Sequence, residues 1–153
     1  MGIEKDIKQA SSFKTEHAKA VVNLIFSYHW LTEKIKSFLQ QEDITLQQYN
    51  ILRILRGSDP RPLSTLDIRE RMLDKMSDTS RIVDRLVLKG WVTKRVRQTD
   101  KRLVDVSITK EGKRLLEKMD KKEGEMNNIV AALSADELKQ LNHLLDHMRG
   151  SVD

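Results

Sequence analysis

Hydrophobic residues recur every three or four positions through much of the chain, and this period predicts helices. The longest is expected over residues 11–41, with one apolar stripe formed by Ala18, Val21, Ile25, Tyr28, Leu31, Ile35 and Phe38. A capping-box pattern from Thr45 to Gln48 predicts the start of a second helix, which runs through Arg56. Both prolines lie in residues 57–62, so this segment is expected to break the helix.

Two shorter helices are expected next. Ser64 and Asp67 predict the start of a third helix that ends near Leu73. Asp74 is expected to cap a fourth helix that ends at Gly90. The apolar side of this fourth helix is predicted to consist of Met76, Thr79, Ile82, Val83 and Leu86.

The hydrophobic period changes to two directly after Gly90, which predicts strands. Residues 91–96 are expected to form one strand and residues 103–109 another, with residues 98–101 as the turn between them. One face of the second strand is predicted to carry Val104, Val106 and Ile108. The segment is therefore expected to be a two-stranded hairpin with a polar, mostly basic tip.

Helical periodicity returns after the hairpin. Thr109 is expected to cap a long helix that reaches about Ala132, and a capping box from Ser134 to Glu137 opens a last helix. The predicted fold class is mainly α, of the α+β kind, in which three helices and a hairpin are flanked by long helices.

Composition narrows the function classes. With 153 residues, 39% hydrophobic and 33% charged, the chain has the size and mixture of one globular domain or of two small lobes. The absence of cysteine excludes disulfides, thiolate metal sites and thiol redox chemistry. No apolar run is long enough for a bilayer, and MGIEKDIKQA lacks the apolar region of a signal peptide, so we expect a cytoplasmic protein without a membrane partner.

The positive charge is concentrated in the middle of the chain. Residues 60–114 hold 15 Lys and Arg against 8 Asp and Glu, whereas the rest holds 13 against 15. A helical pair, a further helix and a basic hairpin between near-neutral helices are what a DNA-reading module on a dimerisation region would require. The alternative is a solvated surface on which the charges are scattered by chance.

Three segments together carry a family resemblance: MLDKMSDTSRIVDRL at 72–86, KGWV at 89–92 and DKRLVDVSITKEG at 100–112. They resemble the winged helix-turn-helix of the MarR family of bacterial transcriptional regulators. The resemblance implies a DNA-binding lobe over residues 42–112. It also implies a helical dimerisation region made of residues 1–41 and 113–153.

The fourth helix would be the recognition helix of such a lobe. Its side away from the core is expected to read the major groove through Ser77, Asp78, Ser80, Arg81 and Arg85. The guanidinium of Arg81 suits guanine or a phosphate oxygen, or alternatively an internal pair with Asp78 or Asp84. The alternative for Arg85 is that, with Asp84, it belongs to internal salt bridges that hold the helix against the wing, and we expect this internal role for Asp84.

The hairpin would be the wing. In the family pattern the arginine corresponding to Arg102 enters the minor groove, and Asp100 is placed to orient it. Nearby phosphates would be neutralised by Lys94, Arg95, Arg97 and Lys101. The alternative is a flexible charged hairpin without a DNA role. Ser64 and Thr65 are expected to face a phosphate at the start of the third helix, or to act only as a cap.

The resemblance also implies a homodimer, because two copies read successive major grooves about 34–36 Å apart. Candidate dimerisation residues are Leu138, Leu141, Leu144, Leu145 and Met148. The alternative is that this apolar stripe belongs to the core of a single chain.

Family members bind small aromatic or anionic effectors in a crevice beside the DNA lobe. Groups of suitable chemistry are His17, Phe26, Tyr28, His29, Trp30 and Tyr49, of which none is singled out as a ligand-binding residue. His143 and His147 lie one turn apart, but two ligands do not make a metal site, and a histidine near a helix C-terminus also suits the helix dipole. No metal and no cofactor are expected.

The expected function is that of a homodimeric repressor that binds an inverted-repeat operator in double-stranded DNA and is released by a small effector. The alternative is a winged-helix module that binds protein without reading DNA. An enzyme is not expected, because the sequence has no nucleophile motif, no phosphate-binding glycine loop and no metal triad.

Overall fold

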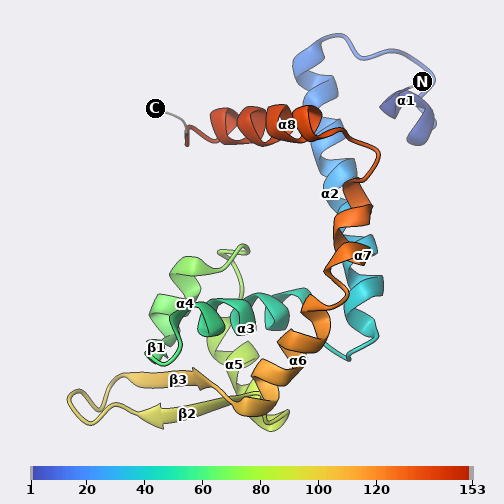
Figure 1. Ribbon diagram of the computed structural model, residues 1–153. Coiled ribbons are helices and arrows are strands. Elements are labelled where there is room, and N and C mark those ends of the chain that lie inside the picture. Colours follow the sequence, from blue (N-terminus) through green and yellow to red (C-terminus); the bar gives the residue numbers. More distant parts are fainter. Residues whose placement is uncertain (1, 152–153) are drawn as a thin grey trace. The chain divides into compact units, whose positions relative to one another are not determined.

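The structure, a computed structural model, describes residues 2–151 (Figure 1). It divides into two compact units, Met1–Glu117 and Lys118–Asp153. The first unit contains every strand of the described chain and the helices from α1 to α5, together with most of α6.

The N-terminal part consists of α1 (Ile3–Asp6) and α2 (Glu16–Gln40). The predicted start of the long helix near residue 11 is therefore too early. Helix α2 begins after Thr15, because the Thr15 side chain accepts a hydrogen bond from the backbone N–H of Ala18 (3.1 Å) and caps the helix there. The short α1 has too few residues to give a hydrophobic period and was not predicted.

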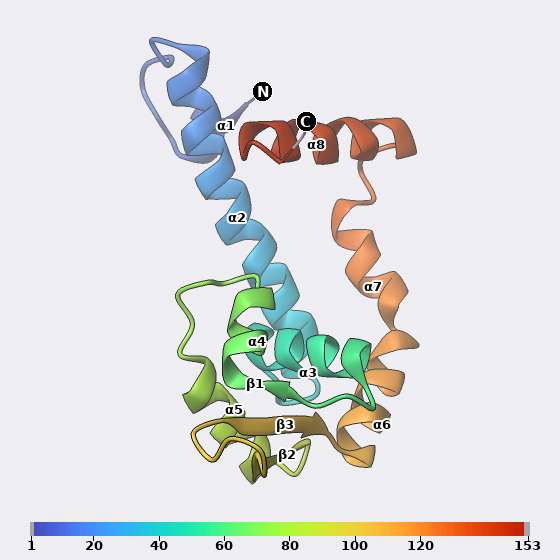
Figure 2. The same ribbon diagram turned by 90° about the vertical axis from the view of Figure 1, so that its left-hand side faces the viewer.

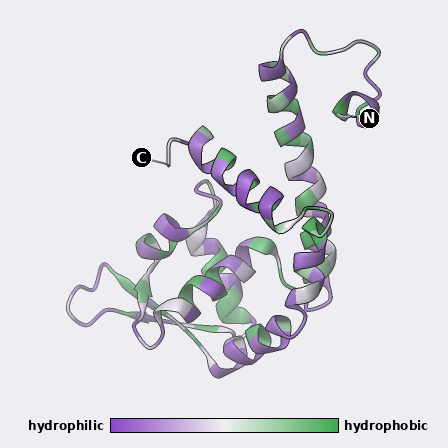
Figure 3. Cartoon of the chain, turned by 45° about the horizontal axis from the view of Figure 1, so that its top comes forward, coloured by the Kyte–Doolittle hydropathy of each residue, from purple (hydrophilic) through white to green (hydrophobic). Residues whose placement is uncertain are grey.

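Most of the apolar stripe on α2 is not buried in this chain. Only Phe38 and Leu39, in the last turn, are buried. Val21, Ile25 and Tyr28 are all more than half exposed. Figure 3 shows green, hydrophobic segments along this helix.

Helix α3 (Leu46–Ser58) begins with the predicted capping box. The Thr45 side chain accepts from the Gln48 N–H (3.2 Å), and the Gln48 side chain accepts from the Thr45 N–H (3.1 Å). The helix ends two residues beyond the predicted Arg56. Its inner side supplies the centre of the first unit's core, where the largest fully buried side chains are Leu39, Ile51, Leu52, Leu55, Leu63, Ile68, Met72, Leu86 and Leu116.

Helices α4 (Thr65–Arg71) and α5 (Thr79–Leu88) form the helix-turn-helix. The prediction that Asp74 starts the second of them is wrong. The Asp74 carboxylate accepts from the Met76 N–H (2.9 Å), and its carbonyl accepts from the Ser77 N–H, which closes a turn outside the helix.

This later start of α5 also corrects the predicted inner face. Met76 lies in the turn and is 92% exposed, so it does not belong to the core. The buried positions on α5 are Thr79, Val83 and Leu86.

The sheet has three antiparallel strands in the order β1-β3-β2: β1 (Leu63–Ser64), β2 (Val92–Val96) and β3 (Val104–Ile108). The hairpin of β2 and β3 was predicted, whereas β1 was not, because two residues give no period. Figure 2 shows β2 and β3 running together, with β1 lying above them between β3 and α3. Val106 and Ile108 are buried on the predicted apolar face of β3.

The single long helix expected from residue 110 to about 132 is wrong. The chain instead forms α6 (Lys110–Asp120), α7 (Glu123–Asn127) and a short 3-10 turn, η1 (Asn128–Val130). Residues 120–125 have the sequence DKKEGE, which offers no apolar stripe to pack and includes a glycine.

The last helix, α8 (Ala135–Met148), begins with the predicted capping box of Ser134 and Glu137. None of its residues is buried in the described chain. Among the described residues, no helix combines the length and the hydrophobicity that a bilayer span requires.

Candidate nucleic-acid interface

Helix α5 separates a buried side from a polar side. Its N-cap, Asp78, accepts from the backbone N–H of Arg81 (3.2 Å), so the carboxylate faces the helix start. Thr79, Val83 and Leu86 anchor the helix in the core, which leaves the predicted Ser80, Arg81 and Arg85 exposed on its outer side. The helix therefore presents two guanidinium groups and a hydroxyl to solvent.

The start of α4 lies beside the start of α5. A small hollow of about 390 Å³ is lined by residues from both, namely Thr65, Leu66, Arg69 and residues 77–80. The predicted candidates Thr65, Ser77, Asp78 and Ser80 are thus brought together around one concave surface.

Ser64 acts as the cap of α4. Its hydroxyl donates to the Asp67 carboxylate (2.8 Å) and accepts from the Asp67 N–H (3.1 Å), and its own N–H donates to the same carboxylate (3.0 Å). These bonds lower the pKa of Asp67, and the charges of Arg71 and Arg97 add to the effect. Because Ser64 is also buried, its hydroxyl is committed to the fold.

The tip of the hairpin is organised by Asp100. Its carboxylate accepts from the backbone N–H (3.1 Å), the Nε (3.1 Å) and the Nη2 (3.3 Å) of Arg102. The same bonds, led by those of the Arg102 side chain, lower the pKa of Asp100. The Arg102 side chain nevertheless stays 91% exposed, so Asp100 fixes its direction without covering it. Figure 1 shows this tip extending beyond β1 and α4 at the left of the view.

The other cations of the lobe fall into two groups. Lys94 pairs with Asp84 of α5 (2.8 Å), and Arg97 pairs with Asp105 of β3 (2.7 Å). Asp84 thus has the expected internal role, through a partner on the hairpin. Of the cations predicted to face DNA, four form no ion pair within residues 2–151: Arg81, Arg85, Arg95 and Lys101.

Asp105 is a site residue that sequence reasoning did not single out. It lies opposite Arg95 in the strand register, and Arg97, the residue directly after β2, is its diagonal neighbour. Alternation along paired strands was the available signal, but it required the register of the hairpin, which the sequence leaves open.

The candidate dimerisation residues are not covered by their own chain. Leu141, Leu144 and Met148 are exposed, and Leu138 and Leu145 are half-buried. No residue of α8 is buried within the described chain.

A larger cavity of about 890 Å³ lies in the first unit, between the second half of α2, the start of α3 and the segment before α5. Its wall mixes Tyr28, Leu31 and Ile35 with the ammonium groups of Lys36, Lys75 and Lys89. Of the six aromatic and imidazole candidates, only Tyr28 lines it.

His143 and His147 stack with ring centroids 6.1 Å apart. No cluster of three or more His, Asp or Glu side chains suited to a metal ion occurs between residues 2 and 151. The pair therefore gains no third ligand in the described chain.

Comparison with known proteins identifies what this lobe is similar to. A family model described as MarR family matches residues 42–103. The multiple antibiotic resistance protein MarR of Escherichia coli (strain K12) is 28% identical over 113 residues, which cover 72% of this chain and 77% of that protein.

Comparison with solved structures also finds MarR proteins. The crystal structure of a MarR transcription factor from Planctomyces limnophilus is 29% identical, with a TM-score of 0.69 over 88% of this chain and 98% of that one. A mutant MarR from E. coli complexed with operator DNA has a TM-score of 0.77 over 90% and 99% of the two chains; at 24% identity it establishes the shared fold.

Proposed function

Because this chain belongs to the MarR family of winged helix-turn-helix transcriptional regulators, we propose that it is a cytoplasmic, sequence-specific repressor that binds an inverted-repeat operator as a homodimer. The family consists of transcription regulators and not of enzymes. We assign the reading of DNA bases to α5 and the contact with the minor groove to the hairpin tip.

The unpaired cations on the exposed side of α5 carry this proposal. A B-DNA major groove admits one helix, and short side chains such as Ser80 permit close approach. Arg81 has two outward donors suited to the O6 and N7 acceptors of guanine, and Arg85 lies one turn further along for a second contact. Ser77 and Asp78, at the start of the helix, border the same surface.

The hairpin tip supplies the second contact. Asp100 directs the exposed Arg102 guanidinium outward, and a narrow minor groove concentrates the negative potential that attracts such a group. The unpaired ammonium of Lys101 lies next to it for a phosphate contact.

The remaining predicted residues divide into those assigned to contact DNA and those assigned to stabilise the fold. Thr65, half-buried at the start of α4, is assigned to a phosphate. Ser64 and Lys94 have internal partners, so we assign them to holding α4 and β2 in place.

Assembly as a homodimer is supported by two apolar surfaces left uncovered in one chain. These are the stripe around Ile25 on α2 and the stripe around Leu144 on α8. A second copy would cover them and would place two recognition helices about 34–36 Å apart, one helical turn of DNA.

Release by a small effector is supported by the 890 Å³ cavity. Its apolar wall suits an aromatic molecule, and three lysines against two aspartates, Asp43 and Asp74, leave the lining with a positive charge that suits an anionic one. Such a ligand releases DNA only if it prefers a chain arrangement that DNA does not.

The test is selection from a pool of random-sequence duplexes at two salt concentrations, followed by sequencing of the bound fraction. Enrichment of an inverted repeat with half-sites one turn apart is the expected result. If nothing is retained at either salt concentration, the DNA-binding proposal is wrong, and the alternative of a protein-binding winged helix takes its place.

A further inference from the structure

We propose that Arg97 is a positioning residue that fixes the outer end of the first hairpin strand on β3 through Asp105, directly before the tip, and that it does not itself contact DNA. The inference rests on the proposed function, since it assigns a role within the same DNA interface. A cation in this role does not touch a phosphate; it holds a second cation in the position from which that one can contact DNA.

The geometry of the pair is that of a structural contact. Both the Nε and the Nη2 of Arg97 donate to one carboxylate oxygen of Asp105, at 2.9 and 2.7 Å. The two side chains are only 31% and 25% exposed. A charged hydrogen bond with this geometry and partial burial is stronger than a pair in free solvent.

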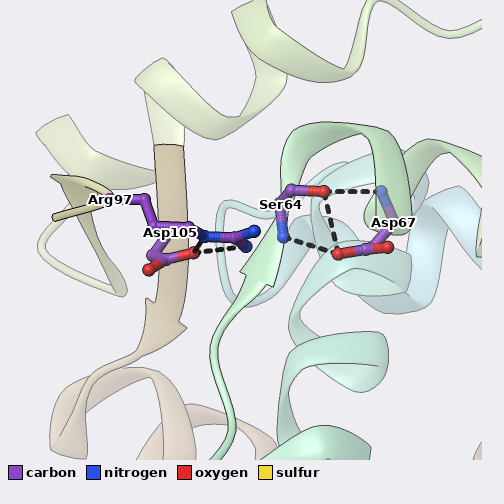
Figure 4. Close-up of polar contacts among 4 residues, drawn as sticks. All are labelled: Ser64, Asp67, Arg97 and Asp105. Atoms are coloured by element: carbon purple, nitrogen blue, oxygen red, sulfur yellow. Dashed lines mark hydrogen bonds and ion pairs between the residues drawn. The ribbon is translucent and has the colours of Figure 1, made fainter. Parts of the chain in front are cut away.

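The pair joins the two strands of the hairpin at the position where β3 also pairs with β1. Asp105 lies opposite Ser64 in the register of β1 and β3, and Ser64 is the cap that starts α4. Figure 4 shows the Arg97 guanidinium extending past Asp105 toward the bonds between Ser64 and Asp67. Arg97 thus contacts the Asp105 carboxylate directly, and its guanidinium lies on the side of β3 that pairs with β1.

The opposite face of the hairpin carries a second attachment. Lys94 is opposite Val106, whereas Arg95 is opposite Asp105, so Lys94 and Asp105 lie on different faces of the sheet. On its own face Lys94 reaches Asp84 of α5. Arg97 with Asp105 therefore joins the two strands of the hairpin on one face, and Lys94 with Asp84 holds the hairpin on α5 from the other face.

This position matters because the tip itself has few other restraints. The hairpin carries Arg102 at its end, and this side chain is nearly fully exposed and, among residues 2–151, is held only by Asp100. A guanidinium that must be ordered on binding costs free energy, and fixing the hairpin directly before its tip in advance lowers that cost.

The experiment measures the affinity of the full chain for the duplex selected above, across a salt series, with Arg97→Ala, Asp105→Asn and the double variant. A positioning role predicts that each single variant weakens binding about tenfold and that the double variant is no weaker than either. The slope of log affinity against log salt stays that of the unaltered chain.

A direct phosphate contact by Arg97 predicts a different pattern. Arg97→Ala would then reduce the salt slope by about 0.9, as loss of one phosphate contact does. Asp105→Asn would strengthen binding, because it removes a negative charge and frees Arg97. Either result would overturn the inference.

Lys113→Ala is the matched control. Lys113 forms a comparably exposed ion pair with Asp59 (2.6 Å) in the same unit but away from the hairpin. This variant also removes one positive charge and one ion pair, and it is expected to leave DNA affinity unchanged.

A second readout needs no DNA and separates this inference from the proposed function. In the free protein, Arg97→Ala and Asp105→Asn should speed amide hydrogen exchange over residues 97–103, whereas Lys113→Ala should not. Unchanged exchange in both hairpin variants would refute the attachment even if the chain binds DNA. Faster exchange in a chain that retains no DNA would refute the proposed function instead.

Discussion

At the scale of single residues, the cations of the lobe differ in whether an acidic partner lies within reach. Arg81 and Arg85 have none in the described chain, and Arg102 has one that leaves it exposed. Side chains of the same charge are therefore suited to different tasks: reading bases, entering a groove or holding the fold.

Replacement of Arg81 and of Arg102 by Ala should separate two kinds of DNA contact. Arg81→Ala is expected to cost about 1–3 kcal/mol on the selected sequence and little on random duplex, because it removes a contact with a base. Arg102→Ala should weaken binding to both duplexes. Titrations of each variant against both duplexes check this; equal affinity of both variants and the unaltered chain would contradict the proposed interface.

Residue types in the interface were predictable from sequence, but their pairings were not. Asp100 and Arg102 are two positions apart, so their contact followed from local geometry. The contact between Asp84 and Lys94 joins a helix to a strand, and that between Arg97 and Asp105 depends on the register of the hairpin. Such contacts depend on tertiary packing, which hydrophobic period alone does not specify.

At the scale of elements, the end of the hairpin and the start of α6 are joined closely. The Thr109 hydroxyl donates to the Gly90 carbonyl (2.7 Å) and accepts from the Gly112 N–H (3.1 Å), and the Thr109 N–H donates to the Trp91 carbonyl. Gly112 allows this approach, since a Cβ there would collide with the Trp91 carbonyl oxygen and lie 2.8 Å from Ile108 Cγ1. The Thr-x-x-Gly pattern thus has a packing reason.

Gly112→Ala should lower the free energy of unfolding by about 1–3 kcal/mol, because the added methyl group overpacks this junction. Urea unfolding measures the change. Gly57→Ala is the control: Gly57 lies in α3 with no atom within 4 Å of an added Cβ, so it should be neutral or slightly stabilising. Equal stability of the Gly112 variant and the unaltered chain would show that the junction is loosely packed.

The cap of α4 should make stability depend on acid. The pKa of Asp67 is lowered chiefly by hydrogen bonds from Ser64, so its contribution is complete above the unfolded pKa of about 3.9 and is lost as pH falls through the folded value. The stability difference between the unaltered chain and Asp67→Asn is therefore expected to shrink below about pH 4. Urea unfolding from pH 2 to 7 checks this; a constant difference would argue against the bond.

Helix starts with a capping box were predicted correctly, whereas the starts of α2 and α5 and the break after α6 were not. Thr45, Ser64 and Ser134 were recognised because a capping box is a local pattern of side chain and backbone. Asp74 was wrongly predicted as a helix cap for a related reason. A short carboxylate can cap a helix, but the Asp74 carboxylate closes a turn. The break after Asp120 lies in a polar run where no signal distinguishes an exposed helix from a loop.

At the scale of the whole molecule, the main feature is that apolar side chains on α2 and on α8 are exposed in a single chain. Ile25 and Leu144 are each 55% exposed, although both belong to apolar stripes. Monomeric proteins seldom expose contiguous apolar surface of this kind without a partner. The proposed partner is a second copy.

Ile25→Glu and Leu144→Glu should each shift the protein toward the monomer, because a buried carboxylate at a dimer interface is costly. Sedimentation equilibrium gives the mass, and helical circular dichroism shows whether the fold is kept. The control is Lys34→Glu, on the opposite side of α2 at 100° per residue, which should leave the mass unchanged. Dimers with all three variants would place the interface elsewhere.

Because the apolar stripe on α2 is exposed in one chain, the lifetime of the proposed dimer in the cell would depend on the concentration of the protein. If two copies must meet to cover this surface, the folded state gains stability by mass action as the chain accumulates. At low abundance, solitary chains would unfold more often and be degraded by proteases sooner. The regulator would then disappear faster than in proportion to its synthesis, and if it is the proposed repressor, this would sharpen the change from a silent to an expressed gene.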